Sequence, residues 1–308
     1  ATSSNFLQAV AYASVINKYS DNLQVDVVSA WQGSEAKMAA MRKSLVRWAT
    51  QTSYTSICSG VFGIGPFEGQ GPVDHVRLFA IDSSFAYFLA VRADSDIQSL
   101  ADLDGEVFAS GTAGSTAAVL IERACEIMGI HPEYFRGSAK DIVQAMQDRR
   151  VEGYFKAGAG GQVDATMMQI DATTPLRLLE IPKDVIDQLT TEFVGLTAYQ
   201  AKKGSMVAFP EQGPIWTMAS PMASVMIADM PQEVSYSAMK ALNEHADMAA
   251  EIYIPIKDSL PDLAAFMVET LNNSTYPEGV PLHVGTYQYL REQGFDIPAK
   301  FIPPEWKG

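Results

Sequence analysis

A glycine-rich turn within residues 100–116 (LADLDGEVFASGTAGST) is the segment of this sequence best suited to bind a ligand. Its pattern predicts a short strand over residues 106–110, then a turn and a helix that begins at Ser115. Backbone N–H groups in such a turn, with the positive end of the helix dipole behind them, bind anions and carboxylates. The turn lacks the lysine of a phosphate-binding loop and the glycine set of a dinucleotide-binding motif. It favours a small organic acid over a nucleotide, although an ordinary strand-to-helix turn has the same pattern.

Polar or glycine-rich turns also lie at the other predicted strand ends and helix starts. In open α/β sheets, ligands bind beyond the carboxyl ends of the strands, where these loops cluster. Polar residues at helix starts also serve as caps, so no single turn identifies a site. The predicted ligand-binding residues are Ser3, Ser4, Asn5, Trp31, Gln32, Ser34, Gln51, Thr52, Ser83, Thr112, Gly114, Ser115, Thr116 and Lys156.

Lys156 is the charged residue of greatest interest among them. It ends an apolar strand predicted over residues 151–157 and precedes the glycine-rich stretch 157–161 (AGAGG). A compact ammonium group in such a loop could neutralise a carboxylate. Alternatively, the lysine extends into solvent from a strand end. Four aromatic residues raise a similar choice between lining an apolar pocket and packing in the core, namely Trp31, Phe85, Tyr87 and Tyr154.

Residue patterns typical of catalysis are absent from the sequence. The four histidines (His75, His131, His245 and His283) form no HExxH or i, i+4 pair, and no GxSxG motif is present. Cys58 and Cys125 fit no CxxC spacing, so we expect two buried free thiols, or one disulfide in an oxidising compartment. For His283 we expect a structural place at a helix start. The sequence therefore predicts no catalytic residue, no metal and no cofactor.

The composition is that of a water-soluble globular protein. The 308 residues are 47% hydrophobic and 19% charged, and no apolar run reaches the roughly 18 residues of a membrane span. Its 36 acidic against 22 basic residues give a net charge of −14, which disfavours nucleic acid or an anionic membrane as partner. An anionic ligand is still compatible, because local donors outweigh a diffuse, salt-screened field.

Strand and helix signals alternate along the chain, which predicts a parallel α/β architecture. Strands are expected over residues 25–30, 48–50, 151–157 and 176–181. Two long apolar runs, residues 79–92 and 216–228, are expected to carry the chain between two lobes. We predict one lobe from residues 1–84 plus 218–308 and another from 85–217, with crossing segments near 84–92 and 215–228. This arrangement is typical of a hinged fold that holds its ligand in the cleft between the lobes.

Several motifs occur in order along nearly the whole chain and carry a family resemblance. They are residues 92–105 (RADSDIQSLADLDG), the turn 112–115 (TAGS), the turn 32–34 (QGS) and the C-terminal stretch 282–294 (LHVGTYQYLREQG). In these motifs the chain resembles the TAXI group of solute-binding receptors, which serve tripartite ATP-independent periplasmic (TRAP) transporters. It departs from the usual pattern at Phe6, Leu7 and Trp31, and at Val284 and Thr286. The first three bear on the ligand, so the glutamate-like solutes of some members are not carried over.

The resemblance implies a type II periplasmic-binding-protein-like fold and a receptor without catalysis. Such a receptor closes on a small organic carboxylate or an amino acid and delivers it to the TRAP membrane permease. It also implies a periplasmic location, with a leader peptide removed or absent from this sequence. Two other functions remain open. An enzyme on the same fold would need a catalytic Cys or His cluster, and an intracellular effector-sensing domain would need a DNA-binding segment.

Overall fold

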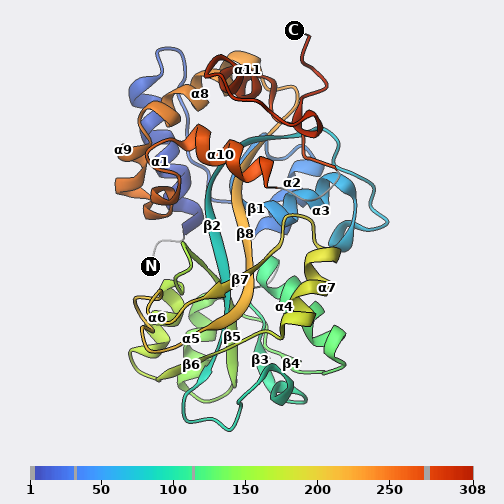
Figure 1. Ribbon diagram of the computed structural model, residues 1–308, viewed down its shortest axis with the longest axis vertical. Coiled ribbons are helices and arrows are strands. Elements are labelled where there is room, and N and C mark those ends of the chain that lie inside the picture. Colours follow the sequence, from blue (N-terminus) through green and yellow to red (C-terminus); the bar gives the residue numbers. More distant parts are fainter. Residues whose placement is uncertain (1–3, 31–32, 113–114, 274–277, 308) are drawn as a thin grey trace. The chain divides into compact units, whose positions relative to one another are not determined.

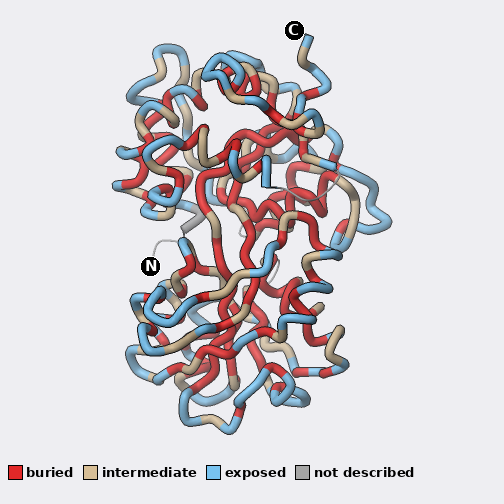
Figure 2. Tube along the Cα trace, viewed as in Figure 1, coloured by how far each residue is buried: buried red, intermediate tan, exposed pale blue. Residues whose placement is uncertain are grey.

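The chain forms two compact units in a computed structural model that describes residues 4–30, 33–112, 115–273 and 278–307. Unit 1 comprises Ala1–Ser83 and Pro221–Gly308, and unit 2 comprises Ser84–Ser220 (Figure 1). The two junctions fall inside the long strands β2 (Val76–Arg92) and β8 (Ile215–Ile227). Nearly every residue of these strands is buried (Figure 2), as expected for apolar strands covered on both faces.

Unit 1 is built mainly from helices. β1 (Trp48–Ser53) pairs antiparallel with β8, and the register shifts between Ala49 and Thr52 at an irregularity of the strand. Gln51, at this shift, has a positive φ of 42°. The other elements are α1 (Ser4–Tyr19), α2 (Ser34–Arg42), α3 (Tyr54–Phe62), η1 (Gly65–Phe67), α8 (Gln232–Glu244), α9 (Ala246–Ile252), η3 (Ile254–Ser259), α10 (Leu263–Asn272), α11 (Val284–Glu292) and η4 (Ala299–Phe301).

Unit 2 has helices on both faces of a sheet. β5 (Gly153–Ala159) pairs antiparallel with β2 and parallel with β3 (Val107–Ala109). Its alternating side chains enter two separate cores, because Tyr154 packs with residues of α5 and α6 and Phe155 with residues of α4 and α7. The remaining elements are η2 (Leu100–Leu103), α4 (Thr116–Met128), β4 (Glu133–Tyr134), α5 (Ala139–Gln147), α6 (Ala165–Asp171), β6 (Leu176–Leu179), α7 (Lys183–Glu192) and β7 (Thr197–Ala201).

The predicted α/β class is confirmed, but the prediction of a parallel sheet is wrong for most strands. Only the β3–β4 and β3–β5 pairs are parallel among the described pairs. They lie where the chain alternates strand and helix, from β3 through α4 and α5 to β5. The long strands β2 and β8 run antiparallel to β5, β6, β7 and β1. The alternation in the sequence therefore predicted the local order of elements and not the direction of the long strands.

The strand predicted over residues 25–30 is also absent, and these residues have no regular secondary structure. The side chain of Asn17 in α1 binds both main-chain groups of Val25. Its Nδ2 donates to the Val25 oxygen at 2.9 Å, and its Oδ1 accepts from the Val25 nitrogen at 2.6 Å. These two hydrogen bonds attach the start of segment 25–30 to α1. The apolar side chains of the segment are available to line a cavity.

Gly285, in the first turn of α11, lies at a close contact between α11 and α8 in unit 1. A Cβ at this position would lie 2.1 Å from the Gln232 oxygen and 2.2 Å from Ser235 Oγ. We expect Gly285→Ala to lower the free energy of unfolding of unit 1 by about 1–3 kcal/mol, because overpacking forces the helices apart. Urea denaturation followed by circular dichroism measures the change. Lys240→Ala, at an exposed position of α8, is the control and should change stability by no more than about 0.5 kcal/mol.

Candidate functional site

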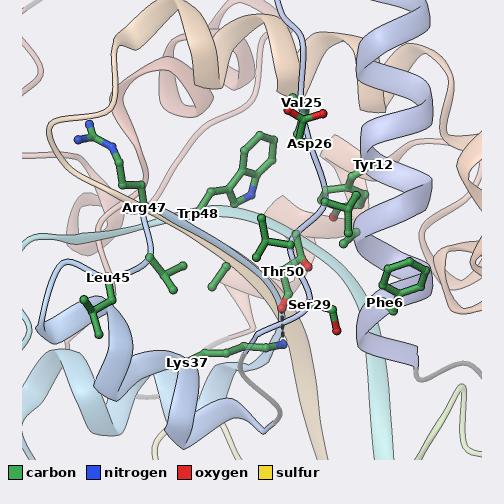
Figure 3. Close-up of a pocket in the computed structure, with 15 residues that line it drawn as sticks. Phe6, Tyr12, Val25, Asp26, Ser29, Lys37, Leu45, Arg47, Trp48 and Thr50 are labelled. Carbon is green, nitrogen blue, oxygen red and sulfur yellow. Dashed lines mark hydrogen bonds between the residues drawn. The ribbon is translucent and has the colours of Figure 1, made fainter.

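Unit 1 contains a cavity of about 350 Å³ between α1, residues 25–29 and the β1 region (Figure 3). Three aromatic side chains contribute to its walls, Phe6 and Tyr12 from α1 and Trp48 from β1. A pocket of this size is at the lower end of the range for small-molecule sites, roughly 300–1,000 Å³. Its other lining residues are Ala9, Val25, Asp26, Val27, Val28, Ser29, Lys37, Leu45, Val46, Arg47, Ala49 and Thr50.

Lys37 brings an amine to this cavity from α2. Its Nζ donates to the Thr50 oxygen at 2.6 Å and to the Gln51 oxygen at 2.9 Å, at the end of β1. The residue is only 7% exposed, and this burial lowers the pKa of the amine to about 7. A lysine in this state changes its charge near neutral pH. The main-chain oxygens that it binds stabilise the protonated form.

Three predicted ligand residues of unit 1 lie together at the end of β1. Ser34 opens α2, and its Oγ accepts a hydrogen bond from the backbone nitrogen of Ser53 at 2.9 Å. Because Ser53 immediately precedes α3, this bond brings the N-termini of α2 and α3 together. Gln51 and Thr52 are buried there, and Gln51 Nε2 donates to the Tyr253 hydroxyl at 2.9 Å. None of the three lines the cavity.

Ser83 lies beside a buried acid that the sequence-based prediction overlooked. Asp82 has no exposed surface, and its carboxylate accepts hydrogen bonds from Tyr12 at 2.6 Å, from Ser83 at 2.9 Å and from Gln8. Burial raises the pKa of Asp82 to about 6, although these donors favour the ionised form. The Ser83 hydroxyl is therefore engaged inside the protein and is itself fully buried.

In unit 2, the glycine-rich turn leads into α4 as predicted. Ser115 is the N-cap, and its Oγ accepts from the Ala118 nitrogen at 3.3 Å. Gly111 has a φ of 133°, and a Cβ there would lie 2.9 Å from Ser115 Oγ, so the turn requires glycine. Thr112 is half-buried, and its oxygen accepts from the Ser115 nitrogen at 3.1 Å. Thr116 is buried in the first turn of the helix.

The place of Lys156 follows from strand register. Ala109 of β3 pairs with Tyr154 of β5 in a parallel ladder. Two residues further on, Gly111 has left β3, whereas Lys156 lies in the middle of β5 opposite Phe88 of β2, so the prediction that it ends the strand is wrong. Side chains alternate along β5, so Lys156 shares the Tyr154 face with α5 and α6, and Phe155 faces α4. Lys156 is half-buried, and it has no hydrogen-bond or ion-pair partner among the residues that the structure describes. Unit 2 thus has a capped helix N-terminus beside β3 and, on the other face of the sheet, a half-buried lysine.

The other predicted ligand residues lie in the first turn of α1 or outside the described part of the chain. Ser3, Trp31, Gln32 and Gly114 lie outside the described residues. Ser4 and Asn5 are in the first turn of α1. Of the aromatic residues considered for a pocket, Phe85, Tyr87 and Tyr154 are buried, and the last two belong to the cores of unit 2.

The sequence-based prediction missed Lys37, Asp82 and Tyr253. The sequence did mark Asp82, because it is an acid within the long apolar run that became β2. An acid in such a run has either a structural role or a role in a site. Lys37 gave a weaker signal, because lysines are common on helices and its spacing does not reveal its burial. Tyr253 is distant in sequence from Gln51 and could not be connected with it.

His283 has the structural role expected of it. It is the fully buried N-cap of α11, where its Nδ1 lies 2.5 Å from Ser235 Oγ and 3.4 Å from the Gly285 nitrogen. Burial lowers its pKa to about 4. Cys58 and Cys125 are buried free thiols, so the disulfide alternative is excluded. Within the described residues, no group of three or more His, Cys, Asp or Glu side chains is placed to hold a metal ion.

The structure is that of a mixed α/β protein whose chain passes twice between two compact units. The chain belongs to the NMT1-like family, whose model matches residues 1–294. None of the helices in the described part of the chain has the length and apolar composition needed to cross a membrane.

Three solved structures illustrate what the chain resembles. One is a structure from work on glutathione import in Streptococcus mutans via GshT and the cystine importer TcyBC. Its sequence is 13% identical, the match covers 80% of this chain and 84% of that chain, and the TM-score is 0.48. An ancestral arginine-binding protein bound to arginine has 12% identity, coverage of 82% and 86%, and a TM-score of 0.48. The ligand-binding component of an ABC-type import system from Staphylococcus aureus has 13% identity, coverage of 98% and 93%, and a TM-score of 0.47. Similarity at this level transfers no ligand to this chain.

Asp82 provides a test of the buried polar network. Its folded-state pKa of about 6 exceeds the ordinary 3.8, so protonation favours the folded state. Its stabilising contribution is complete below pH 4 and is lost as the pH rises through 6, by about 3 kcal/mol in all. We expect Asp82→Asn to raise the free energy of unfolding at pH 8 by about 1–3 kcal/mol and to flatten its dependence between pH 4 and 6. Urea denaturation across this pH range measures both effects.

Asp21→Asn is the control for this experiment, because Asp21 is an exposed acid of the same unit. It should leave the pH dependence of the wild-type protein in place. An Asp82→Asn variant that is less stable at pH 8 and keeps the wild-type slope would contradict the assignment. We expect the substitution to be tolerated because the buried Oε1 of Gln8 has no hydrogen-bond partner in the described structure. A half-turn of the Gln8 amide lets Oε1 accept from the side-chain N–H that Asp82→Asn introduces.

Proposed function

We propose that this protein is a periplasmic solute-binding receptor, without catalysis, that binds a small organic carboxylate or an amino acid and delivers it to a TRAP membrane permease. Membership of the NMT1-like family and the division into two α/β units support a binding role. The TRAP permease and the periplasmic location rest on the sequence motifs that resemble TAXI receptors.

The observation that carries the carboxylate proposal is the glycine-rich turn at the N-terminus of α4, with Lys156 as a second candidate on the other face of the sheet. Lys156 is half-buried and has no ion pair with any described residue, so a ligand carboxylate can become its partner. α4 is 13 residues long, and its N-terminus offers backbone donors and a partial positive charge. Both features favour one negative charge on the ligand over a neutral sugar.

An enzymatic function on the same fold has less support. Burial raises the pKa of Cys58, and it raises the pKa of Cys125 to about 11, so neither thiol supplies a thiolate at neutral pH. His283 is occupied as a helix cap. No observation favours an intracellular effector-sensing domain over a receptor.

The partner transporter can be tested directly. In proteoliposomes that contain a TRAP permease, the loaded receptor should drive solute uptake without ATP. Uptake that requires an ATP-hydrolysing importer would overturn the TRAP assignment and leave the receptor role intact. A thermal-shift screen of small carboxylates and amino acids identifies the solute for this assay.

Lys156→Met tests the role of the ammonium group. We expect the dissociation constant for the carboxylate found in the screen to rise roughly ten- to hundredfold, because a charge-assisted contact contributes about 1.5–3 kcal/mol. Calorimetry measures the change. Lys140→Met, at an exposed position at the start of α5, is the matched control and should bind like the wild type. An unchanged constant for Lys156→Met would mean that Lys156 does not contact the ligand and that another group binds the carboxylate.

A further inference from the structure

The cavity of unit 1 has a chemistry of its own. Its body is apolar and aromatic, with Phe6, Tyr12 and Trp48 around valine, leucine and alanine side chains. The Nε1 of Trp48 is buried and has no hydrogen-bond partner within the described structure. A buried donor without an acceptor is costly, roughly 1–3 kcal/mol, so this wall of the cavity would gain from a polar ligand atom.

The polar groups of the cavity are divided between its two ends. In Figure 3 the Lys37 amine lies close to Thr50 and Ser29, and Arg47 and Asp26 lie at the opposite end. Asp26 and Arg47 are exposed, and Arg47 is 3.3 Å from Asp229. Lys37 is therefore the buried ionisable group at one end of the apolar cavity, and its amine is positively charged when protonated. This arrangement complements a ligand with an apolar body and one acidic end.

We propose that this cavity is a second small-molecule site, which takes an aromatic monocarboxylate with its ring against Trp48, Tyr12 and Phe6 and its carboxylate toward Lys37. All lining residues belong to unit 1, and none is among the solute contacts proposed at Lys156 and α4. Occupancy of this cavity therefore does not require Lys156 or the α4 turn. A ring of the size of indole fits a cavity of about 350 Å³.

Binding at this site should depend on pH. The Lys37 pKa near 7 means that the ammonium form is lost as the pH rises above neutrality, and a carboxylate binds that form. The other ionisable groups around the cavity are Tyr12, Asp26 and Arg47, with Glu35 on α2 bound to Ser56 at 2.6 Å. Asp82 titrates near pH 6 behind Tyr12, so the Asp82→Asn background separates its contribution from that of Lys37.

The experiment compares three probes by calorimetry and Trp fluorescence: indole-3-acetate, neutral indole and acetate. For the wild type we expect saturable binding of indole-3-acetate that weakens about tenfold from pH 6 to pH 8, weaker and pH-independent binding of indole, and no binding of acetate. Lys37→Met should weaken indole-3-acetate at least tenfold at pH 6 and leave indole unchanged. Lys43→Met, at the exposed C-cap of α2, is the matched control and should bind all probes like the wild type.

Two further variants keep the test decisive if Lys37→Met unfolds. Ala9→Phe fills the cavity from α1 and should abolish binding of both ring compounds. Lys156→Met should leave indole-3-acetate binding unchanged, since that lysine belongs to unit 2. The proposal is overturned if the wild type binds no ring probe, if binding survives Ala9→Phe, or if Lys156→Met abolishes it. The last outcome would assign the acid to the proposed solute site.

Discussion

The burial of the Asp82 carboxyl group is the constraint on which the organisation of unit 1 depends. An acid without a cationic partner among the described residues must be surrounded by donors, and these come from separate elements. Gln8 and Tyr12 attach α1 to β2 through it. Tyr253 lies close to the same carboxyl and accepts from Gln51, whose backbone oxygen binds Lys37. One chain of contacts therefore positions α1, the end of β1 and α2, which together form the cavity.

Much of the fold could be predicted from the sequence, because its signals are local. The two apolar runs became β2 and β8, and the Ser115 cap and the His283 helix start lie as expected. Strand direction is not a local property, so the antiparallel pairing of the long strands was missed. The strand predicted over residues 25–30 was wrong for a related reason. A strand needs a partner strand, and the Asn17 side chain binds the first of these residues instead.

The two candidate sites also differ in whether their residues are marked by local sequence signals. In unit 2, the turn before α4 could be inferred from the predicted strand and the Ser115 cap, but the place of Lys156 in the middle of β5 could not, because strand ends are poorly marked in the sequence. In unit 1, the important groups are a lysine on a helix, an acid within a strand and a tyrosine about 200 residues away from its partner Gln51. Their proximity depends on how α9 and β1 pack. No pattern of residue types along the chain encodes that packing.

A net charge of −14 is compatible with acid binding because the acids near the α4 turn are already neutralised. Glu122, one helical turn and a half into α4, accepts from Ser110 at 2.6 Å and from Arg136 at 2.9 Å. Its charge therefore does not oppose a carboxylate at the helix start. More distant acids act across water and salt, which screen them beyond about 8–10 Å. The donors within hydrogen-bond distance decide the sign of ligand that each site accepts. In unit 2 the proposed donors are the α4 N-terminus and Lys156, and each favours an anion.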